Sequence, residues 1–194
     1  LGKLVTDGRF TRCEGVLEAL SIIVPEEFGV EFFDVIPEEF KERHESPQDY
    51  FFDSLPYRDP SSFTDRTREL FDSVQVFEYG FQNRRFDLLV QFATEPSHPW
   101  NAELLHKMLT EKVLPDRDAM WSVYVAKNDH EEGDHQPEST IRSVIDWATF
   151  GDLTFVEEEQ AILSLVTLIW FMTTTNRRTR DQATKAASRL FAKH

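Results

Sequence analysis

The chain has 194 residues, of which 40% are apolar, and its 17 Phe and 4 Trp supply enough apolar surface for one core. This composition excludes a disordered tail, and the single cysteine, Cys13, excludes a disulfide framework or a cysteine-rich zinc site. The formal net charge is -14; residues 177–194 carry +5 of it, which leaves -19 on residues 1–176. A body this acidic repels phosphate backbones, so we expect no nucleic-acid binding.

No stretch of the sequence is typical of a signal peptide or a membrane anchor, so we expect a soluble, cytoplasmic protein without membrane contact. The chain begins with leucine rather than methionine, and we interpret it as an excised piece of a longer protein. Within this piece we expect an N-terminal helical segment over residues 1–49. A continuous helical-repeat scaffold is expected to follow over residues 50–194.

The first half of the chain predicts short helices separated by prolines. Apolar residues recur at helical spacing, and a proline begins or ends most of the runs. The expected helical segments are residues 10–24, 28–35, 37–43, 50–55, 63–74 and 83–92. Pro56 is expected to stop the fourth segment, and Pro60 to start the fifth. We interpret the weak alternation over residues 74–79 as a helix end and a loop.

The second half predicts helices with clearer start signals. The expected elements are a turn over residues 94–99, helices over residues 100–109, 115–126 and 140–150, and an exposed acidic loop over residues 127–138. Pro115 suits the first turn of a helix because its missing N–H has no partner there in any case. Ser139 or Thr140 is the expected cap of the next helix, and Gly151 is expected to end it.

The last part of the chain predicts a helical hairpin. Residues 161–172 are almost wholly apolar, too many for a strand and too few to cross a bilayer, so we expect a buried helix. Three glutamates at 157–159 favour the positive end of its dipole. A polar break over residues 173–176 then precedes a second helix over residues 177–193. Two helices joined this closely form an αα-hairpin.

The second helix of this hairpin has one small, apolar face and one basic face. Asn176 or Thr175 is its expected N-cap. The residues expected to face inward are Ala183, Ala186, Ala187, Leu190 and Phe191. The alanines allow close packing against the apolar helix before it. The basic side chains are expected to form a solvated face, or a face that binds an acidic surface.

Sequence motifs for catalysis are missing. The seven glycines form neither Gly-x-x-x-x-Gly-Lys nor Gly-x-Gly-x-x-Gly, and no Gly-x-Ser-x-Gly occurs. The tryptophans lie in apolar runs and are expected to belong to the core; they are Trp100, Trp121, Trp147 and Trp170. We therefore expect no catalytic, cofactor-binding or metal-binding residue in this piece, and no enzyme activity of its own.

Two local patterns nevertheless suggest metal chemistry. Residues 129–135 combine His130 and His135 with four carboxylates, and such groups can bind a divalent ion. The second pattern, Pro115-Asp116, resembles the start of a metal-dependent nuclease motif. That motif also needs an acidic residue two positions before a lysine, and Val125 stands at that position before Lys127. A metal-dependent hydrolase built on the His130/His135 loop is thus kept as a third alternative. A polar loop without a supporting scaffold favours a solvated segment instead.

Four blocks of sequence together resemble a known family. They are SLPYRDPSSFT at 54–64, ATEPSHPWNAELLH at 93–106 with LPDRDAMW at 114–121, VIDWA at 144–148, and WFMTTTNRRTRDQATKA at 170–186. Their order and content resemble the helical region downstream of the ATPase in prokaryotic antiviral STAND NTPases of the AVAST type. The resemblance implies an α-helical scaffold. The helical segments themselves show no fixed repeat period, so we expect an all-α array of helical hairpins, an irregular α-solenoid, with one compact bundle as the alternative.

The resemblance also implies a division of labour. ATP and Mg²⁺ would bind to an ATPase module outside this piece, and the parent protein would detect phage proteins and then oligomerise. The piece itself would be a non-catalytic scaffold or sensor segment acting through protein–protein contacts. The residues expected to bind a partner or to fix the scaffold are Arg58, Asp59, Asp116, Arg117, Asp118, Asn176, Arg177, Arg178, Arg180, Asp181, Lys185 and Arg189. A stand-alone acidic helical adaptor is the alternative.

Overall fold

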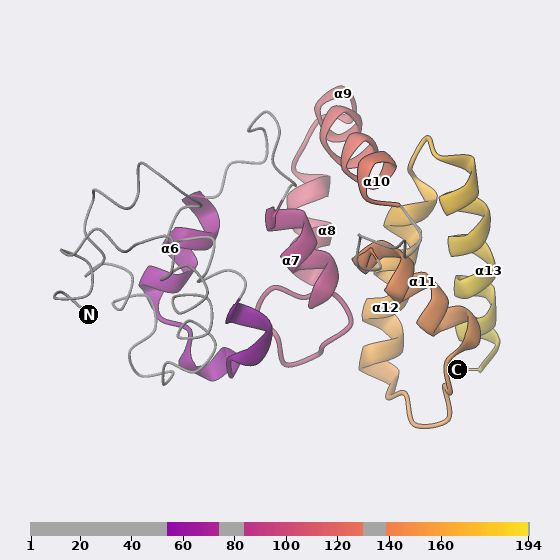
Figure 1. Cartoon of the computed structure of the whole chain (residues 1–194), viewed down its shortest axis with the longest axis horizontal. Coiled ribbons are helices and arrows are strands. Elements are labelled where there is room, and N and C mark those ends of the chain that lie inside the picture. The colour runs from indigo at the N-terminus through magenta and orange to yellow at the C-terminus, as the bar shows by residue number, and fades with distance from the viewer. Residues whose placement is uncertain (1–53, 74–83, 130–138, 194) are drawn as a thin grey trace, which may run out of the picture. The chain divides into compact units, whose positions relative to one another are not determined.

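The computed structural model describes residues 54–73, 84–129 and 139–193 (Figure 1). Every regular element in these ranges is helical and none is a strand, which confirms the all-α fold class. None of the helices in these ranges is long and apolar enough to cross a membrane. The chain divides into two compact units, Leu1–Val74 and Gln75–His194. Cys13 and the helices expected at 10–24, 28–35 and 37–43 lie outside the described residues, as does the loop expected at 74–79.

In the first unit the described residues form two 3-10 turns, η3 (Leu55–Tyr57) and η4 (Pro60–Ser62), and one helix, α6 (Asp65–Ser73). Thr64 and Thr67 start α6 together. The N–H of each donates to the hydroxyl of the other, over 3.2 and 3.3 Å, which satisfies two donors at the helix start. Ser54 is α-helical and η3, which contains Pro56, follows it directly; the fixed φ of proline suits the start of a 3-10 turn. Residues 50–53 of the helix expected at 50–55 lie outside the described residues.

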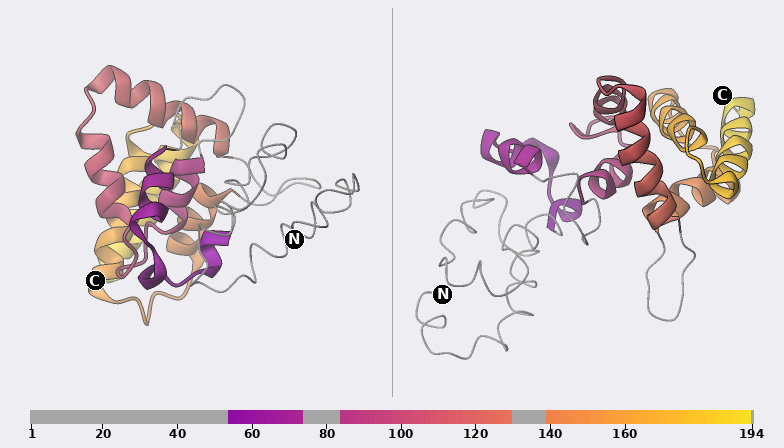
Figure 2. Two further views of the ribbon diagram at one scale, coloured as in Figure 1. Left: turned by 90° about the vertical axis from the view of Figure 1, so that its left-hand side faces the viewer. Right: turned by 90° about the horizontal axis from the view of Figure 1, so that it is seen from above.

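The second unit contains seven α-helices among its described residues. They are α7 (Arg84–Gln91), α8 (Ala102–Thr110), α9 (Leu114–Arg117), α10 (Val123–Asn128), α11 (Thr140–Phe150), α12 (Glu158–Met172) and α13 (Arg177–Lys193). These bounds confirm the helices predicted from residue 83 onward, except in the stretch after Pro115. Helix α12 contacts both α8 and α13 and lies between them when the unit is seen from above (Figure 2).

The stretch after Pro115 is interrupted by a π-helical segment, η5 (Asp118–Ser122), between α9 and α10. The prediction of one regular α-helix is therefore wrong in its middle. Three consecutive residues of this segment, Met120, Trp121 and Ser122, are buried. The indole N–H of Trp121 donates to the carbonyl oxygen of Trp170 over 2.8 Å. The π segment thus joins the end of α12 to the core.

Aromatic rings fill the centre of the second unit. Trp121 stacks on Phe171 of α12 with ring centroids 5.8 Å apart, and Phe86 of α7 meets Trp121 edge-on at 5.4 Å. Tyr124 of α10 is fully buried, and its hydroxyl donates to Asp87 over 2.8 Å. Burial, with the nearby Asp87 carboxylate, raises the pKa of Tyr124 well above its usual range. These contacts fix α7, α10 and α12 to one another.

The α12–α13 hairpin forms as predicted, with the two helices side by side and antiparallel (Figure 1). Asn176 is the cap: its Oδ1 accepts the N–H groups of Arg178 over 3.0 Å and Thr179 over 3.4 Å. Ala183, Ala186 and Leu190 are buried as expected. Phe191 is 76% exposed, so its predicted inward position is wrong. It is the neighbour of the inward Leu190, and one helical step turns it about 100° away.

Helix α12 itself is less buried than its composition predicts. Ile162 and Ile169 are 53% and 52% exposed, although both belong to the apolar run expected to lie in the core. Helices α8 and α13 cover two sides of α12, and α11 also contacts it. The stripe between α8 and α13 remains open to solvent. The prediction of a fully buried helix, which rested on apolar composition, is therefore wrong for this one face.

Candidate functional site

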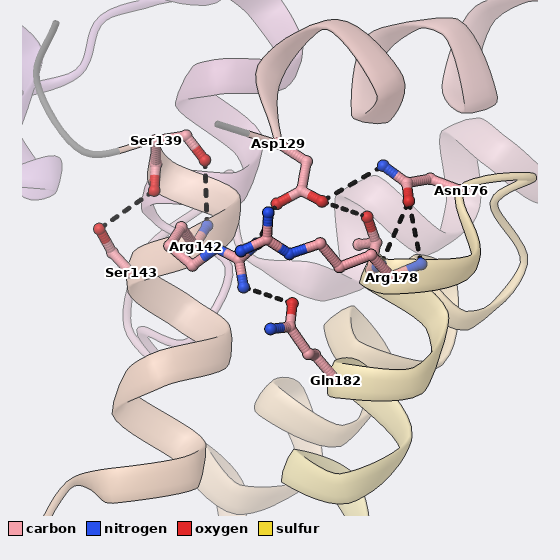
Figure 3. Close-up of polar contacts among 8 residues, drawn as sticks. Asp129, Ser139, Arg142, Ser143, Asn176, Arg178 and Gln182 are labelled. Atoms are coloured by element: carbon pink, nitrogen blue, oxygen red, sulfur yellow. Dashed lines mark hydrogen bonds and ion pairs between the residues drawn. The ribbon is translucent and has the colours of Figure 1, made fainter. Parts of the chain in front are cut away.

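A buried carboxylate, Asp129, joins three helices in the second unit (Figure 3). It directly follows α10, and its side chain is 1% exposed. Its Oδ1 accepts a hydrogen bond from Nη2 of Arg142 in α11 over 2.8 Å. Its Oδ2 accepts from the hydroxyl of Thr179 over 2.5 Å and from the amide of Asn176 over 3.3 Å. Both carboxylate oxygens are thus used inside the fold.

Arg142 is the counter-charge of Asp129 and is 5% exposed. Its Nη1 donates to Oε1 of Gln182 in α13, so the one guanidinium reaches both α10 and α13. The hydroxyl of Ser139 accepts the backbone N–H of Arg142 over 3.1 Å and caps α11, which confirms one of the two predicted caps. A buried ion pair is tolerated where further hydrogen bonds satisfy its polar atoms. Both oxygens of Asp129 and both Nη atoms of Arg142 are bonded, whereas Nε of Arg142 has no partner among the described residues.

Asn176 serves two purposes in this network. Its side-chain oxygen caps α13, while its side-chain nitrogen donates to Asp129. The start of α13 is therefore tied to the end of α10 by the same residue that starts the helix. The expectation that Asn176 pins the turn between α12 and α13 agrees with this geometry, which adds a partner far away in the sequence.

The network has a structural character. Asp129 and Arg142 are enclosed, so neither can present its charge to a ligand from solvent. The prediction of an exposed loop from residue 127 is wrong at its start, because Lys127 and Asn128 end α10 and Asp129 is buried. The acidic composition suggested exposure, but the pairing with Arg142 neutralises this one carboxylate. His130 and His135 lie outside the described residues.

The sequence prediction omitted Arg142, Thr179 and Gln182, and it considered Asp129 only as one carboxylate of the His130/His135 loop. A signal for two of them was present. Arg142 lies within the apolar stripe of α11, next to Ile141 and one turn before Ile145, and a charge in such a stripe calls for a buried partner. Thr179 lies one turn before Ala183 on the inward face of α13. No sequence pattern indicated which carboxylate would meet them.

In the first unit, Arg58 and Asp59 have separate hydrogen-bonding roles. Arg58 is 8% exposed, and its Nε donates to the hydroxyl of Ser54 over 2.9 Å. Asp59 caps η4 by accepting the N–H of Ser61 over 2.8 Å, and this backbone hydrogen bond lowers the pKa of Asp59. Both residues stabilise local turns, in line with the scaffold role expected for them.

The Asp116-Arg117-Asp118 block lies at the junction of α9 and η5. Asp116 and Asp118 are exposed in the first turns of these two segments, where a carboxylate suits the helix dipole. The guanidinium of Arg117 lies 5.5 Å from the ring centroid of Trp170 in a cation–π arrangement. Arg117 thus joins α9 to the end of α12.

The basic residues of α13 divide into two groups. Arg177, Arg178, Arg180 and Lys185 are exposed, and Arg177 forms an exposed ion pair of 3.6 Å with Asp181. Arg189 instead donates to the carbonyl oxygens of Ala148 and Gly151, each over 2.8 Å, where it satisfies the C-terminal end of α11. Arg189 therefore has a structural contact that the sequence did not suggest.

His98 is a buried histidine whose pKa is strongly shifted by its surroundings. It lies in the turn between α7 and α8, is 2% exposed, and stacks on Phe92 with centroids 3.8 Å apart. Its Nδ1 accepts the N–H of Trp100 over 3.1 Å. Burial lowers the pKa of His98 from 6.5 to about 4. The imidazole is therefore neutral at pH 7, and it lines a shallow depression with Pro96, Lys107 and their neighbours.

The described residues contain no group of three or more His, Cys, Asp or Glu side chains placed to hold a metal ion. Comparison with protein-family models, with curated proteins and with solved structures finds no match.

The exposed surface is the other notable feature of the described residues. Large apolar side chains are exposed on it at Tyr57, Val113, Leu114, Val123, Phe150, Phe155, Ile162, Ile169 and Phe191.

Proposed function

We propose that this chain is a non-catalytic helical scaffold or sensor segment that acts through protein–protein contacts. In this proposal it is part of an antiviral STAND NTPase, whose ATPase module lies elsewhere in the parent protein. The support for the family is the sequence resemblance of its four blocks. The support for the contact role is the distribution of polar groups within the second unit.

That distribution is the observation on which the proposal rests. The most buried charged groups, Asp129 and Arg142, bind each other and the helices around them. The exposed groups are of the kind that binds proteins: basic side chains on α13 and single large apolar side chains around the second unit. Arginine and aromatic residues are enriched where protein interfaces gain most of their free energy.

The basic contact face is best represented by Arg178 and Lys185. They are seven residues apart on α13, so they share one side of the helix, and both are exposed. Arg189 is excluded from the test because its bonds to Ala148 and Gly151 make it part of the fold. Reversing the charge at Arg178 and Lys185 changes the surface while leaving the Asp129 network in place.

The experiment is a phage challenge of cells that produce the parent protein with Arg178→Glu and Lys185→Glu. We expect loss of protection, because the contact to an acidic partner surface becomes repulsive. Circular dichroism and thermal unfolding of the isolated chain must be unchanged by the two substitutions. The matched control replaces Lys107 and Lys112, exposed at the end of α8, by glutamate. Full protection by the Arg178/Lys185 variant would refute the proposed contact face.

A further inference from the structure

The exposed stripe of α12 has the spacing of a helix-pairing surface. Ile162, Leu165, Ile169 and Met172 follow one another at intervals of three and four residues, which places them on one side of the helix. Ile162 and Ile169 are about half exposed, and Leu165 and Met172 are partly buried. Helices α8 and α13 pack on either side of α12 (Figure 2). The exposed fractions of Ile162 and Ile169 show that the stripe between them is open.

The two ends of this stripe carry opposite charges. At one end, Glu158 is exposed in the first turn of α12, one turn before Ile162 on the same side. At the other end, Arg180 of α13 donates to the carbonyl oxygen of Thr174 over 3.4 Å, which places its guanidinium at the turn that follows α12. Arg177 begins α13 at the same turn and pairs with Asp181 over 3.6 Å, so Arg180 supplies the positive charge at this end. The stripe is thus acidic at its start, apolar in its middle and basic at its end.

We propose that the α12 stripe binds the same stripe of a second copy of this chain, with the two α12 helices antiparallel about a two-fold axis. A two-fold axis brings residue i of one copy against residue j of the other, and j against i. When Ile162 lies opposite the partner copy's Ile169, Leu165 lies opposite Val166, and Glu158 lies opposite Thr173, beside Arg177 and Arg180.

The charge arrangement selects this partner and this orientation. A parallel pairing would set Glu158 against Glu158 and Arg180 against Arg180, and both contacts would be repulsive. The antiparallel pairing joins each acidic end to a basic end and buries the isoleucines between them. The surface therefore matches itself, as an isologous interface requires. The inference names a second copy as one partner of the scaffold, and it uses none of the residues in the Arg178/Lys185 contact face.

The test is sedimentation velocity of the full 194-residue chain over a concentration series. We expect a monomer–dimer equilibrium. The double variant Ile162→Asp, Ile169→Asp is expected to weaken dimerisation at least about 100-fold, because it removes the apolar centre of the interface. Both residues are half exposed, so the fold tolerates the change, which circular dichroism checks. Val123→Asp, at a residue of α10 that is 44% exposed, is the matched control and leaves the dimer intact.

Charge exchange tests the orientation. Glu158→Arg and Arg180→Glu are each expected to weaken the dimer about 10-fold, because each variant creates two like-charge contacts. Combining both substitutions in one chain restores the dimer, and so does mixing the two single variants. Glu158 and Arg180 lie at opposite ends of α12, so a contact within one chain cannot explain restoration. Glu111→Arg on α8 is the charge control.

Three results would overturn the inference. The first is a chain that stays monomeric up to on the order of 1 mM, the limit of a weak specific interface. The second is a dimer that the Ile162/Ile169 variant does not weaken. The third is a dimer that the single charge variants leave unchanged. None of these results bears on protection by the Arg178/Lys185 variant, so the two proposals fail separately.

Discussion

Asp129 joins the end of α10 to two other helices of the second unit. It receives hydrogen bonds from α11 and from both the cap and the first turn of α13. A buried carboxylate with these partners stabilises the fold only as long as each partner stays in place. We therefore expect the pairing with Arg142 to determine how much Asp129 contributes to the free energy of unfolding. Removing one partner and then both measures this contribution.

We predict that Arg142→Met destabilises the chain by about 3–5 kcal/mol, because it leaves Asp129 buried and uncompensated. The double variant Asp129→Leu, Arg142→Met is expected to regain much of this loss, since no buried charge remains. Urea unfolding followed by the fluorescence of the buried Trp121 measures both free energies. A single variant as stable as the wild type would show that the pair contributes little.

His98 makes a second residue-level prediction, about pH. Its pKa is about 4 in the folded chain and 6.5 in the unfolded chain, so the unfolded state binds more protons between these values. Folding stability from His98 is fully present above pH 6.5 and is lost as the pH falls towards 4. The loss is expected to reach up to about 3 kcal/mol. His98→Gln should flatten this part of the stability profile, and an equal slope in both proteins would contradict the assignment.

At the scale of the element, Gly151 shows how one residue ends a helix. It follows α11, and its N–H donates to the carbonyl oxygen of Trp147 over 2.8 Å. A β-carbon at this position would lie 2.5 Å from that same oxygen and 3.1 Å from Cδ1 of Trp147. The backbone itself is extended and unstrained, so close approach, rather than a left-handed turn, requires glycine here.

We predict that Gly151→Ala lowers the stability of the chain by about 1–3 kcal/mol, because the end of α11 must shift away from Trp147. Thermal unfolding measures the effect. The neighbouring Phe150 is 79% exposed, and Phe150→Ala should change the stability by less than about 0.5 kcal/mol. Equal effects of the two substitutions would mean that the close approach at Gly151 is relieved at little cost.

The elements also show which information the sequence contains. The bounds of α13 and its cap were predictable because Asn176 and the spacing of Ala183, Ala186 and Leu190 are local signals. The π segment was not, because it depends on Trp121 reaching Trp170, 49 residues away. The exposed stripe of α12 was not predictable either, since the faces left open depend on where α8 and α13 pack. The Asp129 network could not be predicted for the same reason, because its partners are separated by up to 50 residues in the sequence.

At the scale of the whole molecule, charge is unevenly distributed along the sequence. Residues 177–194 carry +5 within a chain of -14. On α13, Arg178 and Lys185 share one side of the helix, whereas Arg180 reaches the turn that follows α12 and Arg177 pairs with Asp181. Two contact surfaces on one rigid hairpin would let a scaffold bind a second copy and a different protein at the same time. We expect raised salt concentration to weaken both contacts, because both include exposed charges.

The proposal that this chain is a scaffold segment of an antiviral STAND NTPase is best tested by sequencing the open reading frame that encodes it. We expect a longer frame with a Gly-x-x-x-x-Gly-Lys-[Ser/Thr] module upstream of Leu1, because the nucleotide would bind there. A start codon immediately before Leu1 together with a stop codon directly after His194 would contradict the claim. The chain would then be a small acidic helical adaptor.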